Sequence, residues 1–318
     1  MKPLPSMLAA TRLTQAGKLL EAGEMLREMF GGGAAAPEPV ARTGQFLERS
    51  YTGPAGRIDY KLYVPLNATA GAPLVVMLHG CTQSPDDFAT GTRMNALADA
   101  HGVLVAYPAQ ARTANAQKCW NWFVPAHQTR DRGEPALIAG LTREIIAGYA
   151  VDRTRVFVAG LSAGGAAAAV MAETYPELFA AVGVHSGIAC GAARDLSSAM
   201  QTMQRGSGKP GVAARLVPTI TFHGDRDSTV NEANAGEVVA RAGGAARGLT
   251  TLVTSGVSTG GRHYTQAVSR DSSGRAMIEQ WTIHGAGHAW SGGDAAGSYT
   301  DPLGPDASSE MLRFFLQR

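Results

Sequence analysis

Short apolar runs rich in β-branched residues alternate with stretches of helical composition over most of this chain. Such alternation is typical of a mostly parallel central sheet with helices on both faces. The expected strands are residues 74–78, 103–107, 156–159, 181–184, 219–222 and 280–283, and the expected helices are residues 94–100, 136–149, 166–175 and 309–317. We therefore predict an α/β fold. In such a fold, the loops at the carboxyl ends of the strands form the active-site crevice.

The most informative of these loops follows the expected strand 156–159. Residues 160–164 read GLSAG, and the helix 166–175 comes directly after them. A serine hydroxyl becomes a useful nucleophile when it is held exposed beside a base, and a sharp turn between strand and helix holds it in this way. The GxSxG pattern alone can be an ordinary glycine turn. Its position between a strand and a helix favours Ser162 as the nucleophile of an α/β-hydrolase fold.

A serine nucleophile of this kind requires an acid and then a histidine on later loops. After the expected strand 219–222, Asp227 is the candidate for the acid that orients the histidine, and Asp225 is the alternative. The candidate base is His288, because it lies beyond the last expected strand in a glycine-flanked loop from which it can reach the serine. His284 still belongs to the strand end, and we expect it to make a structural hydrogen bond.

Acyl transfer also requires hydrogen-bond donors for the oxyanion. These are typically the amide after the nucleophile and an amide from the loop after an early strand. Ala163 supplies the first amide. The expected strand 74–78 runs into the sequence HGCTQ, where the turn can direct the Cys81 amide toward the same point. A thiol nucleophile at Cys81 is the competing hypothesis, and the complete serine machinery disfavours it.

Composition argues against several other classes of function. The net charge is +2, from 28 basic and 26 acidic side chains, so we expect no general attraction to nucleic acid or to an anionic membrane. The chain has no apolar run of the roughly 18 residues that a membrane helix needs. The histidines and the three cysteines are too scattered for a zinc site, and we expect neither a metal nor a cofactor. The expected partner is a small-molecule, oligomeric or polymeric ester substrate.

The first 44 residues differ from the rest of the chain. Apolar residues recur at roughly helical spacing over residues 11–30, and the following sequence GGGAAAPEP interrupts this pattern. We predict an amphipathic helix and a linker over residues 1–44 and a catalytic domain over residues 45–318. We expect this helix to pack on its own domain, and a homodimer or partner contact is the alternative. Polar residues interrupt its apolar positions, which argues against a secretory signal, so the expected location is cytoplasmic, with secretion as the alternative.

The motifs together resemble the esterase family that includes poly(3-hydroxybutyrate) depolymerases and related feruloyl and acetylxylan esterases. In chain order they are LHGCTQ at 78–83, CWNWF at 119–123, GLSAGG at 160–165, HGDRD at 223–227 and GHAWSGG at 287–293. The resemblance covers roughly residues 45–318. It implies an α/β-hydrolase fold and the same triad and oxyanion donors that the residues themselves indicate.

The resemblance has two further implications. Four aromatic side chains are expected to wall the substrate cleft, namely Trp120, Trp122, Phe123 and Trp290, although such residues are usually buried for packing. The motifs of Cys81 and Cys119 are expected to meet at the cleft, so a disulfide between them is a hypothesis. Such a bridge fits poorly with a reducing cytoplasm.

These observations predict a serine carboxylic-ester hydrolase that works through an acyl-enzyme. The expected substrates are short-chain polyhydroxyalkanoate oligomers, such as those of 3-hydroxybutyrate, or a polyester. A feruloyl-type, acetylxylan-type or other small-ester esterase is the alternative. A serine peptidase uses the same triad, and a non-catalytic binding protein on this fold predicts that a triad residue is missing.

Overall fold

The computed structural model describes residues 43–209 and 211–318, together with Ala9, Arg12, Leu13 and Lys18. The chain divides into two units, Met1–Arg42 and Thr43–Arg318. The predicted amphipathic helix and linker fall almost entirely outside the described residues, so they stay predictions. The second unit contains the whole sheet.

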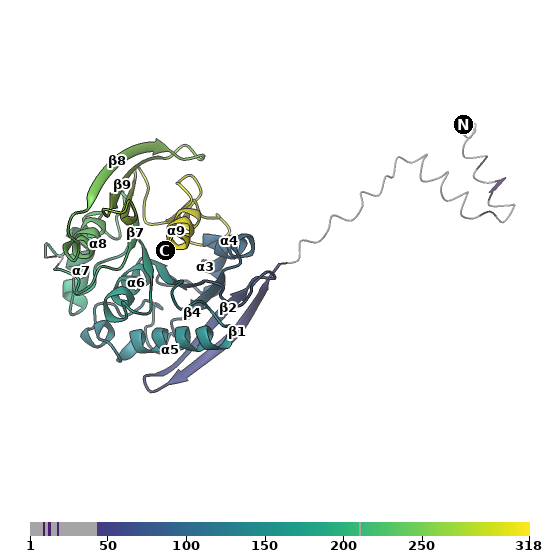
Figure 1. The fold of residues 1–318 in the computed structure, drawn as a ribbon, viewed down its shortest axis with the longest axis horizontal. Coiled ribbons are helices and arrows are strands. Elements are labelled where there is room, and N and C mark those ends of the chain that lie inside the picture. The colour runs from purple at the N-terminus through teal and green to yellow at the C-terminus, as the bar shows by residue number, and fades with distance from the viewer. Residues whose placement is uncertain (1–8, 10–11, 14–17, 19–42, 210) are drawn as a thin grey trace. The chain divides into compact units, whose positions relative to one another are not determined.

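The sheet has ten strands in the order β1-β2-β4-β3-β5-β6-β7-β10-β9-β8 (Figure 1). The strands are β1 (Gln45–Gly53), β2 (Gly56–Val64), β3 (Leu74–Leu78), β4 (Leu104–Pro108), β5 (Val156–Leu161), β6 (Ala181–His185), β7 (Thr219–Gly224), β8 (Thr250–Val257), β9 (His263–Arg270) and β10 (Ala276–Ile283). The six central strands, β4-β3-β5-β6-β7-β10 in this order, pair in parallel. The pairs at both edges of the sheet are antiparallel. The predicted α/β-hydrolase architecture with a mostly parallel central sheet is confirmed.

All six expected strands belong to this parallel centre. They are recognisable in the sequence because strands covered on both faces are continuous apolar runs, and every residue of β3, β4, β5, β6 and β7 is buried. The hairpins β1–β2 and β8–β9 were not expected. Strand β8 is exposed along almost its whole length, so no buried apolar pattern identifies it.

Helices cover both faces of the sheet, as the alternating pattern predicts. They are α3 (Pro85–Thr92), α4 (Met94–His101), the 3₁₀ helix η1 (Pro125–Gln128), α5 (Gly133–Gly148), α6 (Ala163–Thr174), α7 (Leu196–Arg205), α8 (Ala233–Gly244) and α9 (Ala307–Leu316). A small parallel pair, β11 (Trp290–Ser291) and β12 (Thr300–Asp301), lies outside the main sheet. The expected helices 94–100, 136–149, 166–175 and 309–317 correspond to α4, α5, α6 and α9.

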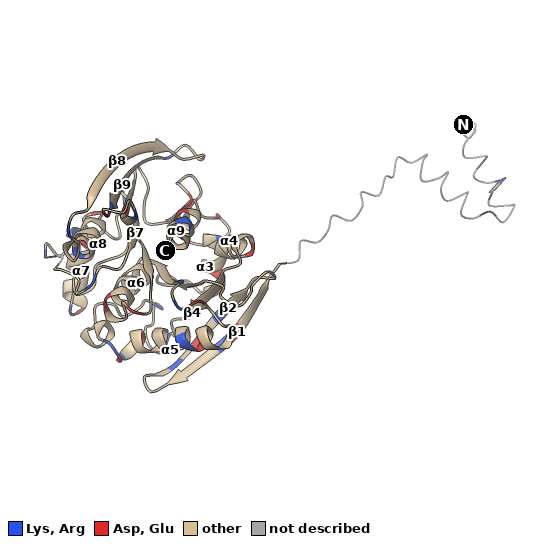
Figure 2. Ribbon diagram, viewed as in Figure 1, with Lys and Arg blue, Asp and Glu red and all other residues tan. Residues whose placement is uncertain are grey.

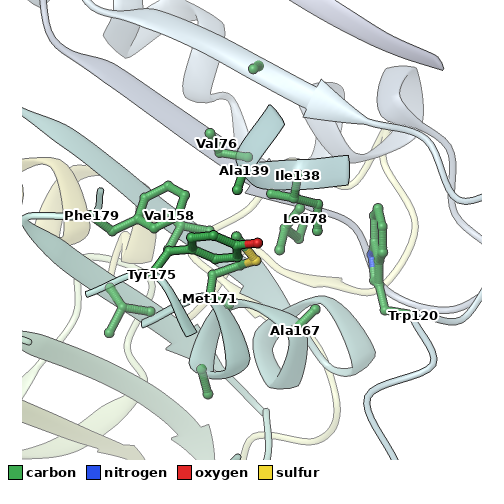
Figure 3. Close-up of a cluster of buried hydrophobic side chains, with 14 of the residues drawn as sticks. Val76, Leu78, Trp120, Ile138, Ala139, Val158, Ala167, Met171, Tyr175 and Phe179 are labelled. Carbon is green, nitrogen blue, oxygen red and sulfur yellow. The ribbon is translucent and has the colours of Figure 1, made fainter. Parts of the chain in front are cut away.

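Two hydrophobic clusters fill the space between the sheet and its helices. Side chains alternate between the faces of a strand, so Leu74, Val76 and Leu78 of β3 join one cluster while Val75 and Met77 join the other. The first cluster packs against α5 and α6, and Figure 3 shows several of its members from these strands and helices. The second cluster packs against α3, α4 and α9. This packing holds the carboxyl ends of the central strands in fixed positions.

Lys, Arg, Asp and Glu residues are distributed over many helices, strands and loops of the described domain, with both signs interspersed along the ribbon (Figure 2). No helix in the described part of the chain is long and apolar enough to cross a membrane.

Candidate active site

A pocket with a volume of about 180 Å³ lies where the loops after β3, β5, β7 and β10 meet. The side chains and backbone that line it are those of Gly80, Cys81, Leu161, Ser162, Met203, Thr229, His288 and Tyr299. Four separate loops of the sheet contribute to this lining. The predicted nucleophile, base and oxyanion loop are therefore brought together at one site, as expected for the carboxyl edge of a parallel sheet.

Ser162 lies in the sharp turn between β5 and α6. Its φ of 58° and ψ of −120° are strained for a residue with a side chain, and such strain is concentrated at functional positions. The Ser162 amide donates to the His185 carbonyl at 2.9 Å, which anchors the turn to β6. A Cβ at Gly160 would lie 2.6 Å from the Leu78 carbonyl oxygen, and one at Gly164 would overlap the same carbonyl. Only glycine therefore allows β3, β5 and α6 to approach this closely.

His288 and Asp227 form a direct hydrogen bond. His288 Nδ1 lies 2.7 Å from Asp227 Oδ2. Because an ionised carboxylate can only accept, the neutral ring carries its proton on Nδ1 and its lone pair on Nε2. In the described structure, Ser162 and His288 line the pocket without a direct hydrogen bond between their side chains. Catalytic hydrogen bonds are often long before substrate binds and tighten in the complex.

The Asp227 carboxylate is fully enclosed and is held by backbone amides. Its Oδ1 accepts from the Thr229 amide at 2.9 Å and from the Val230 amide at 2.8 Å. His223 Nε2 lies 3.5 Å from Oδ2, and the same nitrogen lies 2.7 Å from the Val230 carbonyl. Burial raises the pKa of Asp227, but the hydrogen bond and charge of His288, together with the Val230 amide, lower it by more, so the net shift is downward. The carboxylate is therefore well placed to orient His288.

The residues that supply the two expected oxyanion amides, Cys81 and Ala163, lie on separate elements beside the pocket. Ala163 is the first residue of α6, where amides have no partner within the helix and the helix dipole favours negative charge. In the loop after β3, the Gly80 amide donates to Gln83 Oε1 at 2.8 Å, and the Thr82 amide donates to the Gln117 carbonyl at 2.6 Å. Because these two amides are engaged, the Cys81 amide is the one of the three that remains for the pocket.

The loop that carries Cys81 is tied to the segment 110–120. Trp120 Nε1 donates to the His79 carbonyl at 3.0 Å, and the Gln110 amide donates to His79 Nε2 at 3.1 Å. Burial lowers the pKa of His79 to about 4, so its ring is neutral and can accept this bond. The backbone position of the oxyanion loop thus depends on a second segment of the chain.

Cys81 and Cys119 are bonded to each other, as hypothesised, and this disulfide is a further connection between the two segments. Because the Cys81 sulfur is part of a disulfide, it cannot act as the thiol nucleophile of the competing hypothesis. Cys190 is the free cysteine of the described residues, and burial raises the pKa of its thiol to about 12. Disulfides persist mainly in oxidising compartments, and the cellular location stays a prediction.

The alternative acid and base pair with each other instead of facing the pocket. His284 Nδ1 lies 2.9 Å from Asp225 Oδ2, and His284 is more exposed than His288. The structural hydrogen bond expected for His284 is therefore present. The described residues contain no group of three or more His, Cys, Asp or Glu side chains that could hold a metal ion.

The prediction that four aromatic residues wall the cleft is corrected in part. Trp120 and Trp290 are at most 1% exposed, so their rings offer no surface to a substrate. Trp120 belongs to the core cluster beside β3 (Figure 3), and Trp290 packs against Phe88 while its Nε1 donates to Ser308 Oγ. None of the four lines the pocket around Ser162. The side chains of Trp120 and Trp290 therefore pack in the core. Trp122 and the partly exposed Phe123 stay predictions as substrate contacts.

Three residues that line the pocket are neither predicted site residues nor direct neighbours of one in the chain. They are Met203 of α7, Thr229 and Tyr299, which precedes β12. Thr229 lies in the loop after β7 that carries Asp227, which we call the acid loop. The Asn231 amide donates to the Met203 carbonyl at 2.7 Å, which attaches α7 to the acid loop. The loop motif HGDRDSTV contains Thr229 and could have indicated it. No sequence signal places Met203 or Tyr299, because long connections bring both to the site.

The chain is similar in sequence to known esterases and depolymerases. The sequence model of the family described as esterase PHB depolymerase matches residues 58–244. Poly(3-hydroxyalkanoate) depolymerase C of Paucimonas lemoignei is 34% identical over 246 residues, which are 73% of this chain and 58% of that protein. Feruloyl esterase B of Neurospora crassa is 38% identical over 128 residues, which are 40% of this chain and 43% of that protein. The chain thus spans about half the length of these curated relatives.

The fold is also that of solved esterases. The acetyl xylan esterase from Aspergillus awamori superposes with a TM-score of 0.67 at 21% identity, over 86% of this chain and 100% of that chain. At this identity the likeness concerns the fold alone. The family assignment rests on sequence, since the family model covers more than half of the chain and the Paucimonas depolymerase is 34% identical over most of it. On these grounds the chain belongs to the PHB depolymerase family of esterases.

Proposed function

We propose that this chain is a serine carboxylic-ester hydrolase that works through an acyl-enzyme. Ser162 is the nucleophile, His288 the general base and Asp227 the carboxylate that orients His288. The amides of Cys81 and Ala163 bind the oxyanion. The observation that carries the proposal is the hydrogen bond between Asp227 and His288, which leaves His288 Nε2 free in the pocket that also contains the strained Ser162.

Each step uses groups that line this pocket. His288 Nε2 takes the proton of Ser162 as Oγ attacks the ester carbonyl carbon, and the negative charge develops on the carbonyl oxygen beside the two amides. Collapse of the tetrahedral intermediate breaks the bond to the alcohol, which receives the proton from His288. A water molecule, deprotonated by His288, then attacks the acyl carbon and releases the acid and free Ser162.

The lining of the pocket favours a neutral substrate. Leu161, Met203 and Tyr299 present apolar surface, and no Lys, Arg, Asp or Glu is among the described residues that line it. A charged acyl group would lose its hydration without gaining an ion pair. The volume of about 180 Å³ suits a short acyl chain better than a long one.

We infer that short 3-hydroxyalkanoate oligomers, such as those of 3-hydroxybutyrate, are the substrates, or a polyester of the same units. The name of the 34% identical relative, a poly(3-hydroxyalkanoate) depolymerase, supports this choice. An acetylated or feruloylated carbohydrate is the alternative, because other relatives carry the names acetylxylan esterase and feruloyl esterase. A hydroxyacyl group and an acetyl group are both short and neutral.

A substrate panel tests the proposal. Purified protein and its Ser162→Ala variant are assayed with 3-hydroxybutyrate oligomers, acetylated xylan, a feruloyl ester, an aryl ester and a peptide anilide. We expect turnover of the aryl ester and the oligomers by the wild-type protein, and a loss of several orders of magnitude in the variant. Preferential hydrolysis of the anilide would replace the esterase assignment with a peptidase. Highest kcat/KM on acetylated xylan or on the feruloyl ester would favour the alternative substrates.

A further inference from the structure

A second Asp–His–hydroxyl chain lies next to the proposed triad. Asp225 Oδ2 lies 2.9 Å from His284 Nδ1, and His284 Nε2 lies 2.9 Å from Thr265 Oγ1. Asp225 Oδ1 also accepts from the Gly285 amide at 2.7 Å. Asp225 comes from the loop after β7, His284 directly follows β10, and Thr265 is the third residue of β9. The chain therefore connects three neighbouring strands of the sheet at the edge where the active site lies.

The same two loops carry the proposed catalytic acid and base. Asp225 precedes Asp227 by two residues, and His284 precedes His288 by four. Backbone bonds also join the loops, because the Asp225 amide donates to the Ile283 carbonyl at 3.1 Å and the Arg226 amide to the Ala286 carbonyl at 2.9 Å. Only Gly287 lies between Ala286 and His288, so the backbone conformation of Gly287 sets the position of His288 relative to these bonds.

The loop of residues 284–288 carries the proposed base and is called the base loop. Its two glycines give its backbone more conformational freedom than other residues would. Gly285 has a φ of 75°, and a Cβ at Gly287 would meet no atom within 4 Å. Glycine loses more conformational freedom on folding than any other residue, so this loop needs contacts that hold it. Asp225 supplies two such contacts, one to the His284 ring and one to the Gly285 amide.

We propose that Asp225 and His284 are positioning residues that fix the separation and orientation of Asp227 and His288. The inference rests on the proposed function, since its consequence is the alignment of the catalytic histidine. Thr265 orients the His284 ring from β9 and completes the connection. Loss of this side-chain connection lets the base loop sample conformations in which His288 is misaligned, and misplacement by about 1 Å can reduce a rate by about 100-fold.

A second catalytic centre is the competing interpretation of the Asp225–His284–Thr265 chain. Thr265 lies in a regular strand, with Thr282 of β10 opposite it on one side and Ser255 of β8 on the other. It therefore lacks the strained turn that exposes Ser162 and the helix amides that follow that serine. This geometry orients a ring and does not present a nucleophile.

Four variants and a matched control test the inference. Asp225→Ala removes the contacts to the His284 ring and to the Gly285 amide, and Thr265→Val removes only the outer hydroxyl. His284→Asn keeps a donor toward Asp225, and His284→Ala removes it. The control is Asp271→Ala, because Asp271 also accepts backbone amides in a turn and pairs with Arg275, but lies at the other end of β9 and β10.

We expect Asp225→Ala to lower kcat for an aryl ester about 10-fold with KM within about 2-fold of the wild-type value, as for other residues that orient a reacting group through a hydrogen bond. Thr265→Val is expected to give a smaller loss in the same direction, and His284→Asn a smaller loss than His284→Ala. Asp271→Ala should leave kcat unchanged. In proton NMR, the low-field Nδ1–H resonance of His288, assigned by its loss in His288→Ala, should broaden or shift in Asp225→Ala and stay in place in Asp271→Ala.

Several results would overturn the inference. It fails if Asp225→Ala and Thr265→Val retain wild-type kcat and an unchanged His288 resonance, or if Asp271→Ala loses as much activity as Asp225→Ala. Labelling of Thr265 by an aryl ester in a Ser162→Ala background would show a second nucleophile instead. Failure of the proposed function is distinguishable, because it appears as a wild-type protein without ester turnover, and the NMR comparison does not depend on activity.

Discussion

Replacement of Asp227 by asparagine keeps the shape of the side chain and changes its hydrogen-bonding capacity. In the wild-type protein, Oδ1 accepts from the amides of Thr229 and Val230, and Oδ2 accepts from His288 Nδ1. The two backbone donors require an oxygen at their position, so the NH₂ group of the asparagine side chain must face the imidazole. A donor cannot accept from Nδ1–H, and the His288 ring responds by adopting the tautomer that carries its proton on Nε2. That tautomer cannot take the proton of Ser162.

The expected loss follows from this change of tautomer. In the well-studied serine protease triad, the same substitution leaves the geometry intact and lowers kcat about 10⁴-fold. At about 1.36 kcal/mol per tenfold change, this loss corresponds to roughly 5.4 kcal/mol of transition-state stabilisation. The oxyanion amides and the pocket are untouched, so KM should change much less than kcat.

Steady-state kinetics with an aryl ester measure the effect of Asp227→Asn directly. The reasoning is refuted if the folded variant keeps more than about one tenth of the wild-type kcat, because His288 would then function without the orienting carboxylate. Circular dichroism and thermal unfolding show whether the variant is folded.

The ionisation of Asp227 gives a second readout of the same substitution. Because the net pKa shift of Asp227 is downward, its ionised form is favoured in the folded protein. The carboxylate therefore adds to the free energy of unfolding above the pKa of the unfolded chain, about 3.9, and this contribution is lost as the pH falls through the lower folded-state pKa. The difference in the free energy of unfolding between wild-type protein and Asp227→Asn, measured in urea, should be larger at about pH 7 than at about pH 3.

Further substitutions test the turn, the oxyanion loop and the pocket. Gly164→Ala should destabilise the fold by about 3 kcal/mol in urea unfolding, because its Cβ overlaps the Leu78 carbonyl, whereas Gly236→Ala, on an open surface of α8, should stabilise it by about 0.5 kcal/mol; equal effects would contradict the close-approach argument. Reduction of the disulfide by a dithiol, or Cys119→Ser, should lower kcat about 10-fold by releasing the Cys81 amide; unchanged kcat would show that the remaining bonds suffice. Met203→Ala should raise kcat/KM for longer acyl chains relative to acetyl, and an unaltered ratio would exclude Met203 as an acyl contact.

The central strands and the proposed catalytic residues could be predicted because each leaves a local signal. Strand β5 is a continuous buried run that ends directly before Ser162, and glycines lie on both sides of this serine. The order of Ser162, Asp227 and His288, each after a separate strand, is a property of the chain that needs no coordinates.

Other features depend on contacts between distant segments. Met203 and Tyr299 reach the pocket through long connections, and no periodicity indicates where those connections run. The resemblance misled at Trp120 and Trp290, which it implies as walls of the cleft. Both side chains are buried, as their residue type alone suggests. The edge strand β8 carries neither a buried face nor a strong alternation, so only its pairing with β9 defines it.

Covalent trapping tests the central claim most directly. An aryl phosphonate ester reacts with an activated serine and forms a stable adduct that mimics the tetrahedral intermediate. After incubation of the purified protein, intact-mass and peptide mass spectrometry should show one adduct, on the peptide that contains Ser162, with loss of ester turnover in proportion to labelling. An adduct on another residue, or full turnover in a protein that carries the adduct on Ser162, would contradict the assignment of Ser162 as the nucleophile.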